Sequence, residues 1–275
     1  MGNVLKMQTE LDSSADNLPV QYKLPIGEAL VPMNQHIGAH LKLSYQGEIN
    51  CIACGRKTSK SFGQGHCFPC FRRLASCDMC VMKPETCHYA AGTCREPAWG
   101  ESHCFIPHYV YLANSSGIKV GITRETQVPM RWMDQGASQA LPVFEVDNRL
   151  QSGLLEVVLK QHVSDRTDWR KMLTGDAEPV DLESVRDELL ATCRKEIAAI
   201  KEQQGSDAIR VIDGKVVTIN YPVSVYPDKI KSLNLDKQPE IDGILLGIKG
   251  QYLILDSGVL NIRKFSGYNI QLDFI

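Results

Sequence analysis

Residues 51–70 read CIACGRKTSKSFGQGHCFPC, in which two Cys-x-x-Cys pairs are separated by twelve residues. Cys51 pairs with Cys54, and Cys67 pairs with Cys70. A gap of two residues lets both thiolates of a pair point at one tetrahedral ion, while backbone N–H groups of the turn support the sulfur atoms. These four cysteines therefore predict a structural zinc site. A redox-active dithiol needs a single pair, so two tandem pairs argue against redox chemistry.

A second cysteine cluster follows the first directly. Its members are Cys77, Cys80, Cys87, Cys94 and Cys104, and His88, His103 and His108 lie in the same stretch. We expect a second metal site with four ligands here, again structural zinc. The spacing leaves the ligand set open: it favours Cys77, Cys80, Cys94 and Cys104, with Cys87 or His88 as substitutes. An iron–sulfur cluster is the alternative occupant, because four thiolates suit either metal.

The composition places the chain among globular proteins. It has 275 residues, of which 43% are hydrophobic and 23% charged, so disorder and fibrous architectures are excluded for most of it. Nine of the ten cysteines lie between Cys51 and Cys104, and the tenth, Cys193, falls on the apolar stripe of a predicted helix and is expected in the core. No apolar run approaches the ~18 residues that span a bilayer, and the N-terminus lacks a signal pattern. We therefore expect a cytoplasmic protein with no membrane partner.

The formal net charge of -2 excludes a uniformly basic protein that coats nucleic acid. The charge is uneven, however. Residues 51–175 hold 15 Lys+Arg and 11 Asp+Glu, a net charge of +4. If the protein binds DNA or RNA, we expect the middle of the chain to make the contact.

The order of the expected elements predicts an α+β protein. Residues 1–30 are predicted as a loosely ordered arm and 37–49 as a strand, which could join a C-terminal β module. Residues 181–204 have helical periodicity and end at Gly205. The division that follows is an N-terminal arm and strand (1–50), a cysteine-rich double zinc module of knuckle or ribbon type (51–107), an α/β domain (108–175), an amphipathic helix (176–205) and a small β module (206–275).

Residues 109–123 read YVYLANSSGIKVGIT and predict a β-hairpin with its turn at 114–117. A short helix is expected over 130–135, a strand over 143–146 and a helix over 154–163. Tyr111 and Lys119 share one face of the hairpin if the turn at Gly117 holds a bulge, and face apart otherwise.

This hairpin resembles the opening of the GIY-YIG nuclease superfamily, especially its phage-type branch, in which the second motif reads Lys-Ile-Gly. Arg131 lies ten residues after Gly121, and Glu156 lies 25 residues further on, where the family has a helix arginine and a metal-binding glutamate. His162 and Trp169 also look like that branch. The resemblance covers about residues 108–173, and it implies a three-stranded antiparallel sheet with helices.

The resemblance implies hydrolysis of phosphodiester bonds in DNA or RNA. Tyr111 would hold or deprotonate the attacking water, with Tyr109 as a substitute, and Lys119 would lower the pKa of that phenol or activate the water itself. Arg131 would bind the phosphate, and Glu156 would carry Mg²⁺ or Mn²⁺. The alternative is a non-catalytic protein that binds nucleic acid, or assembles with a partner, through the zinc module.

On a wider scale, nearly the whole chain resembles a bacterial domain family of unknown function. The stretches that carry this resemblance are Gly65-His66-Cys67, Gly92-Thr93-Cys94-Arg95, RWMDQGA over residues 131–137 and GIKGQY over residues 247–252.

Overall fold

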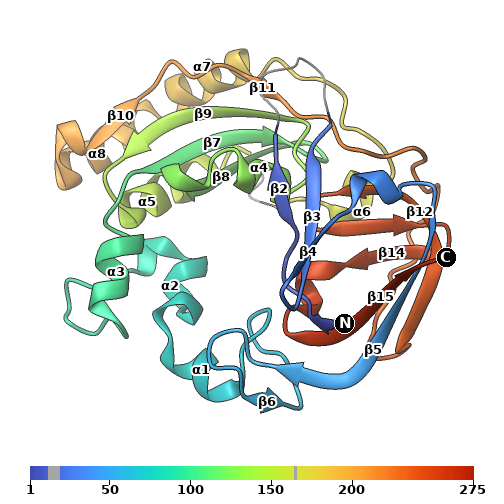
Figure 1. The fold of residues 1–275 in the computed structure, drawn as a ribbon. Coiled ribbons are helices and arrows are strands. Elements are labelled where there is room, and N and C mark those ends of the chain that lie inside the picture. Colours follow the sequence, from blue (N-terminus) through green and yellow to red (C-terminus); the bar gives the residue numbers. More distant parts are fainter. Residues whose placement is uncertain (12–18, 164–165) are drawn as a thin grey trace.

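The computed structural model describes residues 1–11, 19–163 and 166–275, and it combines helices with antiparallel sheets (Figure 1). The α+β fold class is thereby confirmed. In this described part of the chain, none of the helices has the length and apolar character that a bilayer span requires.

The predicted hairpin forms one side of a five-stranded sheet, with β8 as its edge strand. The order is β10-β9-β7-β8, and β11 also pairs with β9. The strands are β7 (His108–Asn114), β8 (Ile118–Arg124), β9 (Gln139–Val146), β10 (Ile209–Val211) and β11 (Val217–Thr218). We expected β10 and β11 in the C-terminal β module, and that expectation is wrong: they extend this sheet because Ile209 pairs with Val146 and is buried in the same core.

The connection between β7 and β8 decides which side chains share a face. Asn114 pairs with Ile118 and Tyr111 pairs with Gly121, so the loop has three residues. Gly117 takes a φ of +141° in this loop, a region that favours glycine. The odd loop length puts Tyr111 and Lys119 on the same face of the hairpin. The loop thus supplies the extra residue that we expected from a bulge.

Helices cover the face of this sheet that carries Val110 and Leu112. They are α5 (Arg149–Leu159), α7 (Leu182–Thr192) and α8 (Arg194–Gln204). The single helix expected over 181–204 is therefore interrupted at Cys193, which is buried as predicted and lets both halves contribute to one core. Helix α5 begins earlier than expected because Asn148 and Gln151 form a capping box.

The opposite side of the molecule is a seven-stranded sheet with the order β1-β15-β5-β12-β13-β14, in which β6 also pairs with β5. Its strands are β1 (Gly2–Asn3), β5 (His40–Asn50), β6 (Lys57–Thr58), β12 (Glu240–Lys249), β13 (Tyr252–Leu255), β14 (Gly258–Asn261) and β15 (Tyr268–Phe274). The predicted strand over 37–49 thus joins the C-terminal strands. The five-part domain division stays a prediction, and its first and last parts share this sheet.

Residues 1–30 are not a loose arm. Besides β1 they contain β2 (Gln8–Glu10), β3 (Gln21–Ile26) and the start of β4 (Ala29–Pro32), which form a third sheet. Val4, Met7, Tyr22 and Leu24 are at most 1% exposed, in the same core as Tyr111. Long-range burial orders this segment, whose local pattern has no clear period; the part of the prediction that concerns 12–18 lies outside the described residues.

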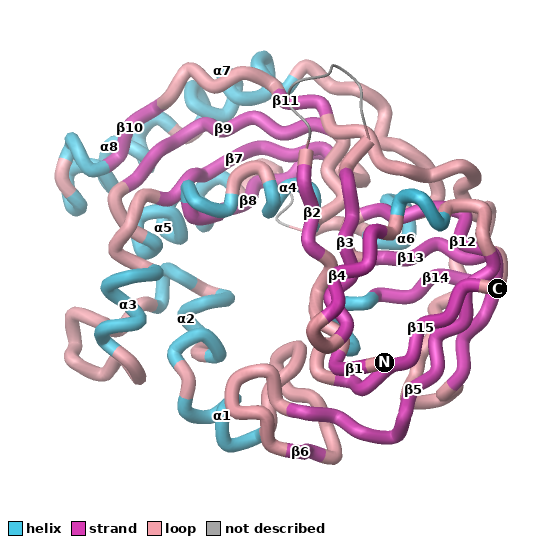
Figure 2. The backbone as a smooth tube through the Cα atoms, in the orientation of Figure 1, coloured by secondary structure: helices cyan, strands magenta, loops and turns pink. Residues whose placement is uncertain are grey.

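The cysteine-rich segment arches from β6 to β7 as short helices and loops (Figure 2). Its helices are α1 (Phe68–Arg73), α2 (Met79–Met82) and α3 (Pro97–His103). Around the first cysteine pairs, the buried cluster consists of Cys51, Cys67 and Cys70 with Leu74 packed against it. So small an apolar cluster contributes little stability, and a bound metal would have to supply the rest.

The remaining helices are short. Helices α4 (Met130–Asp134) and α6 (Trp169–Met172) both follow the hairpin in sequence, and α4 confirms the short helix expected over 130–135. Single 3-10 turns complete the chain: η1 (Asn34–His36), η2 (Ala75–Cys77), η3 (Pro84–Thr86), η4 (Glu125–Gln127), η5 (Ser206–Ala208) and η6 (Ile262–Phe265).

Candidate functional site

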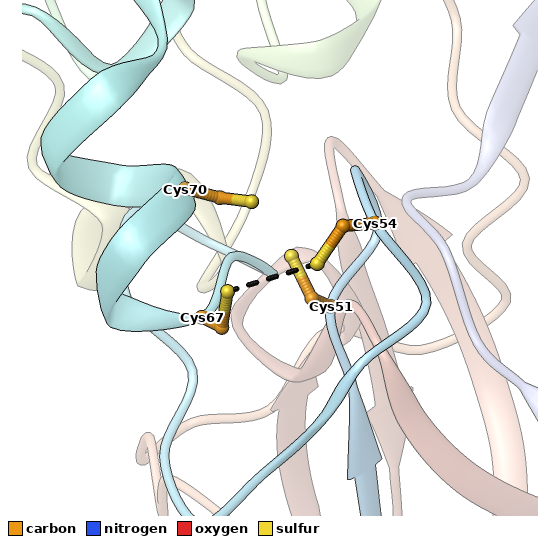
Figure 3. A group of neighbouring side chains, drawn as sticks. All are labelled: Cys51, Cys54, Cys67 and Cys70. Atoms are coloured by element: carbon orange, nitrogen blue, oxygen red, sulfur yellow. Dashed lines mark hydrogen bonds between the residues drawn. The ribbon is translucent and has the colours of Figure 1, made fainter.

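The first four cysteines converge on one point, as the spacing predicts (Figure 3). Cys51 follows β5 directly, Cys54 lies in the turn after it, Cys67 precedes α1 and Cys70 lies within α1. All four sulfur atoms lie within 4.8 Å of one another, and those of Cys54 and Cys67 are 3.8 Å apart. A tetrahedron of Zn–S bonds of about 2.3 Å places its sulfurs about 3.8 Å apart. The cluster therefore fits a structural zinc ion.

The surroundings of the cluster favour thiolates but also crowd them. Burial disfavours the Cys51 thiolate, yet backbone N–H groups of Cys67, Ala53 and Cys54 outweigh it and lower the pKa of the Cys51 thiol to about 6. The Cys54 thiol beside it, together with burial, raises the pKa of Cys70 to about 12. The first thiolate of the cluster forms easily, but each further thiolate would be repelled by it. A divalent cation is therefore needed to hold all four sulfurs deprotonated.

The five later cysteines divide between two places. Four of them, Cys80, Cys87, Cys94 and Cys104, line one small cavity together with Asp78 and His88. Cys77 lies elsewhere: its sulfur is 3.9 Å from where a Cβ on Gly63 would stand, and the charge of Cys51 acts on it. The structure thus separates Cys77 from the three cysteines with which the spacing grouped it.

The residues implied as catalytic come from four elements, and the charges of two of them act on the other two. Tyr111 is on β7, Lys119 on β8, Arg131 on α4 and Glu156 on α5. Tyr111 stands opposite Gly121, which leaves room for the ring: a Cβ at Gly121 would lie 2.7 Å from the Tyr111 Cζ and Oη atoms. The fold therefore requires glycine at the position where the resemblance places one.

The charges of Arg131 and Glu156 act on both Tyr111 and Lys119. Burial raises the pKa of Tyr111, although the Arg131 guanidinium, which hydrogen-bonds the phenol, opposes this shift. Burial, reinforced by Arg131, lowers the pKa of Lys119 to about 7, and Glu156 opposes that shift. At neutral pH the phenol is therefore protonated, while the ammonium is close to its midpoint.

Both strand residues are covered by protein. Tyr111 is 0% exposed and its hydroxyl donates to Gln135 Oε1 at 3.1 Å. Lys119 is 4% exposed and its Nζ donates to Thr167 Oγ1 at 2.5 Å. Arg131 and Glu156 are half-buried. Arg131 and Glu156 are therefore more accessible than the two strand residues.

Tyr109 belongs to different surroundings. Burial raises the pKa of its hydroxyl, and the carboxylates that add to this shift are Glu125 and Glu145 rather than Glu156. Tyr109 is therefore not influenced by the same charged residues as Tyr111 and Lys119.

The pattern that defines the family described as "Protein of unknown function (DUF2797)" matches residues 38–270. The chain belongs to this family. The match confirms the wider resemblance noted in the sequence, and it spans the cysteine-rich segment, the five-stranded sheet and most of the seven-stranded sheet of this DUF2797 protein. Neither a curated protein nor a solved structure matches the chain.

Sequence reasoning missed two polar residues of the cluster in this DUF2797 protein. Gln135 accepts from Tyr111, and it lies four residues after Arg131, a spacing that puts both near one face of α4 and its C-terminal end. Thr167 contacts both Lys119 and Ser115. The helical spacing could have indicated Gln135, but the contact of Thr167 is long-range and has no local signal.

Proposed function

We propose that this protein is a zinc-stabilised nuclease that hydrolyses phosphodiester bonds with a divalent metal ion, on a GIY-YIG-like domain over about residues 108–175. The observation that carries the proposal is the joint action of Arg131 and Glu156 on Tyr111 and Lys119. These positions match the family's motifs, and they lie on four separate elements. A mutual influence of charged and titratable residues from separate elements is typical of an active site, and it supports the proposal.

The opposite pKa shifts assign roles to the two strand residues. A general base works best with a pKa near the ambient pH, and the pKa of Lys119 is lowered to about 7. The pKa of Tyr111 is raised, so its phenol serves as a hydrogen-bond donor and not as a base. Lys119 would therefore take the proton from water while Tyr111 orients the reacting group, which favours one of the two roles left open by the sequence.

Arg131 and Glu156 would contact the substrate. A guanidinium offers parallel donors to two phosphate oxygens and stabilises the charge that develops on them. Mg²⁺ is commonly held by one or two carboxylates together with substrate phosphates, so Glu156 suffices as the protein ligand of Mg²⁺ or Mn²⁺. Bound there, the ion would polarise a phosphate oxygen.

Nucleic acid is the proposed substrate because the excess of positive charge lies in the part of the chain that holds the cysteine-rich segment and the proposed catalytic residues. Residues 51–175 carry a net charge of +4 although the whole chain carries -2. Arg72 and Arg73, in the last turn of α1, are both exposed beside the first cysteine cluster. The cysteine-rich segment would therefore bind the phosphate backbone, with DNA and RNA both accepted as candidates.

The test is a cleavage assay of the purified zinc-loaded chain on plasmid DNA, single-stranded DNA and structured RNA, each with Mg²⁺ or Mn²⁺. We expect cleavage that Glu156→Gln and Arg131→Ala each reduce on the order of 10²-fold or more, with folding and zinc content unchanged. Glu202→Gln and Arg194→Ala, at exposed positions of α8, are the matched controls and should cleave like the wild type.

A second candidate function is non-catalytic binding of nucleic acid. It is favoured by the burial of Tyr111 and Lys119, whose polar atoms are occupied by Gln135 and Thr167. If the wild type is inert on every substrate but binds nucleic acid in a zinc-dependent, salt-sensitive way, this second function replaces the first. A Tyr111→Phe variant separates the roles: retained binding with lost cleavage would place the hydroxyl in catalysis.

A further inference from the structure

The cavity beside α2 and α3 is lined by cysteines from four parts of the chain. Cys80 lies within α2, Cys87 ends the 3-10 turn η3, Cys94 lies in the following loop and Cys104 ends α3. The first cysteine cluster shows that this chain uses short helices and turns to gather thiols. The second cavity has the same construction.

The four thiols are close enough to influence one another. The charges of Cys87, Cys104 and Cys94 all act on Cys80, and those of Cys87 and Cys94 act on Cys104. Cys94 is seated against α3, since a Cβ on Gly100 would lie 3.5 Å from its sulfur. All four sulfur atoms therefore belong to one cavity, in which they are more widely spaced than those of the first cluster.

The nitrogen and oxygen groups at this cavity are already engaged. Asp78 Oδ2 accepts from Arg95 Nε at 2.7 Å, and its Oδ1 accepts from the Met79 N–H at 2.6 Å as the cap of α2. His88 Nδ1 lies 2.8 Å from Thr93 Oγ1, and its Nε2 lies 3.4 Å from Asp78 Oδ2. Asp78 and His88 approach the sulfur of Cys80 to within 4.8 Å, but their hydrogen bonds commit them to neighbours. Asp78 and His88 are therefore suited to position the cysteine ligands and not to bind the metal ion themselves.

A buried cation stands beside these thiols. Arg149, the first residue of α5, is close enough for the charges of Cys104 and Cys80 to act on it. Its Nη2 donates to the Val81 carbonyl at 2.5 Å, while its Nε has no hydrogen-bond partner among the described residues. Its backbone N–H donates to the Cys104 carbonyl at 2.8 Å. A divalent ion with four thiolates carries a net charge of −2, of which a neighbouring guanidinium would balance one unit.

We propose that Cys80, Cys87, Cys94 and Cys104 form a second tetrahedral zinc site, that Cys77 is not a ligand, and that Arg149 balances part of the charge of the site and ties it to α5. Four soft thiolates in a closed tetrahedron are typical of structural zinc. The site would hold α2, η3 and α3 against α5, where Gly153 allows close packing: a Cβ there would lie 2.6 Å from the Pro84 Cβ atom. This inference does not depend on the proposed nuclease function, because metal content is measured without substrate.

The test is the zinc content of the full chain, measured by native mass spectrometry of protein prepared without chelator. We expect two zinc ions in the wild type, one in Cys87→Ser, and two in the matched control Cys77→Ser. His88→Ala should also keep two. Loss of one zinc from Cys77→Ser or His88→Ala, or two zinc ions in Cys87→Ser, would overturn the assignment.

A measurement on the wild type covers the case in which Cys87→Ser does not fold. With cadmium in place of zinc, ¹¹³Cd NMR of the full chain should give two resonances, both in the range of four-thiolate coordination. A resonance typical of mixed sulfur and nitrogen or oxygen ligands would refute the four-cysteine set. Iron with acid-labile sulfide in the purified protein would refute zinc as the occupant.

Discussion

The buried Lys119 should make the stability of the fold depend on pH. Burial lowers the pKa of Lys119 from 10.5 to about 7 in the folded chain. Between these two values the unfolded chain binds about one proton more than the folded chain at this residue, so stability rises with pH. The slope is about 1.4 kcal/mol per pH unit, which gives on the order of 2 kcal/mol between pH 7.5 and pH 9.0.

The perturbation that isolates this effect is Lys119→Met, which keeps the aliphatic stem and removes the titrating group. Urea unfolding followed by circular dichroism at pH 7.5 and 9.0, at fixed zinc concentration, gives the change of unfolding free energy with pH for each protein. We expect this change to be about 2 kcal/mol more positive in the wild type than in Lys119→Met. Terms that do not depend on pH, such as the lost hydrogen bond to Thr167, cancel in the comparison.

The matched control is Lys195→Met, because Lys195 is exposed on α8. This variant should keep the pH dependence of the wild type. If Lys119→Met also keeps it, the ammonium is not desolvated in the folded protein, and both the lowered pKa and the role of Lys119 as a base are refuted.

Three other expectations follow from the same contacts. Chelation should release zinc and expose the amides of residues 51–107 to rapid hydrogen exchange, since the apolar cluster there is small; exchange unchanged by chelation would contradict a structural role for the metal. Gly121→Ala should destabilise the protein by about 1–3 kcal/mol through the contact with Tyr111, while Gly175→Ala, which meets no atom within 4 Å, should cost far less in the same urea titration. Reversing the charge of Arg72 and Arg73 to Glu should weaken nucleic-acid binding and flatten its salt dependence in fluorescence anisotropy; an unchanged salt slope would exclude this surface as the contact.

The sequence alone determined the features whose partners are close along the chain. The first cysteine cluster needs only Cys51, Cys54, Cys67 and Cys70, which a turn and one helix bring together, so spacing was enough to predict it. The β7–β8 hairpin follows in the same way from alternation and a short turn. In both cases the geometry depends on about 20 residues or fewer, and local backbone preferences fix it.

Other features depend on which distant segments pack together, and only the tertiary structure decided them. The spacing grouped Cys77 with Cys80, but the packing of η2 against the first cluster turns Cys77 toward Gly63. Residues 1–11 lack a local pattern, and they are ordered because Val4 and Met7 fill a core made by strands from the other end of the chain. Burial lowers the pKa of Lys119, and one of the residues that contact its ammonium group is Thr167, which lies 48 residues away in the sequence. Burial and electrostatics are properties of neighbours in space, and a local pattern carries no information about a neighbour that the chain reaches only by folding.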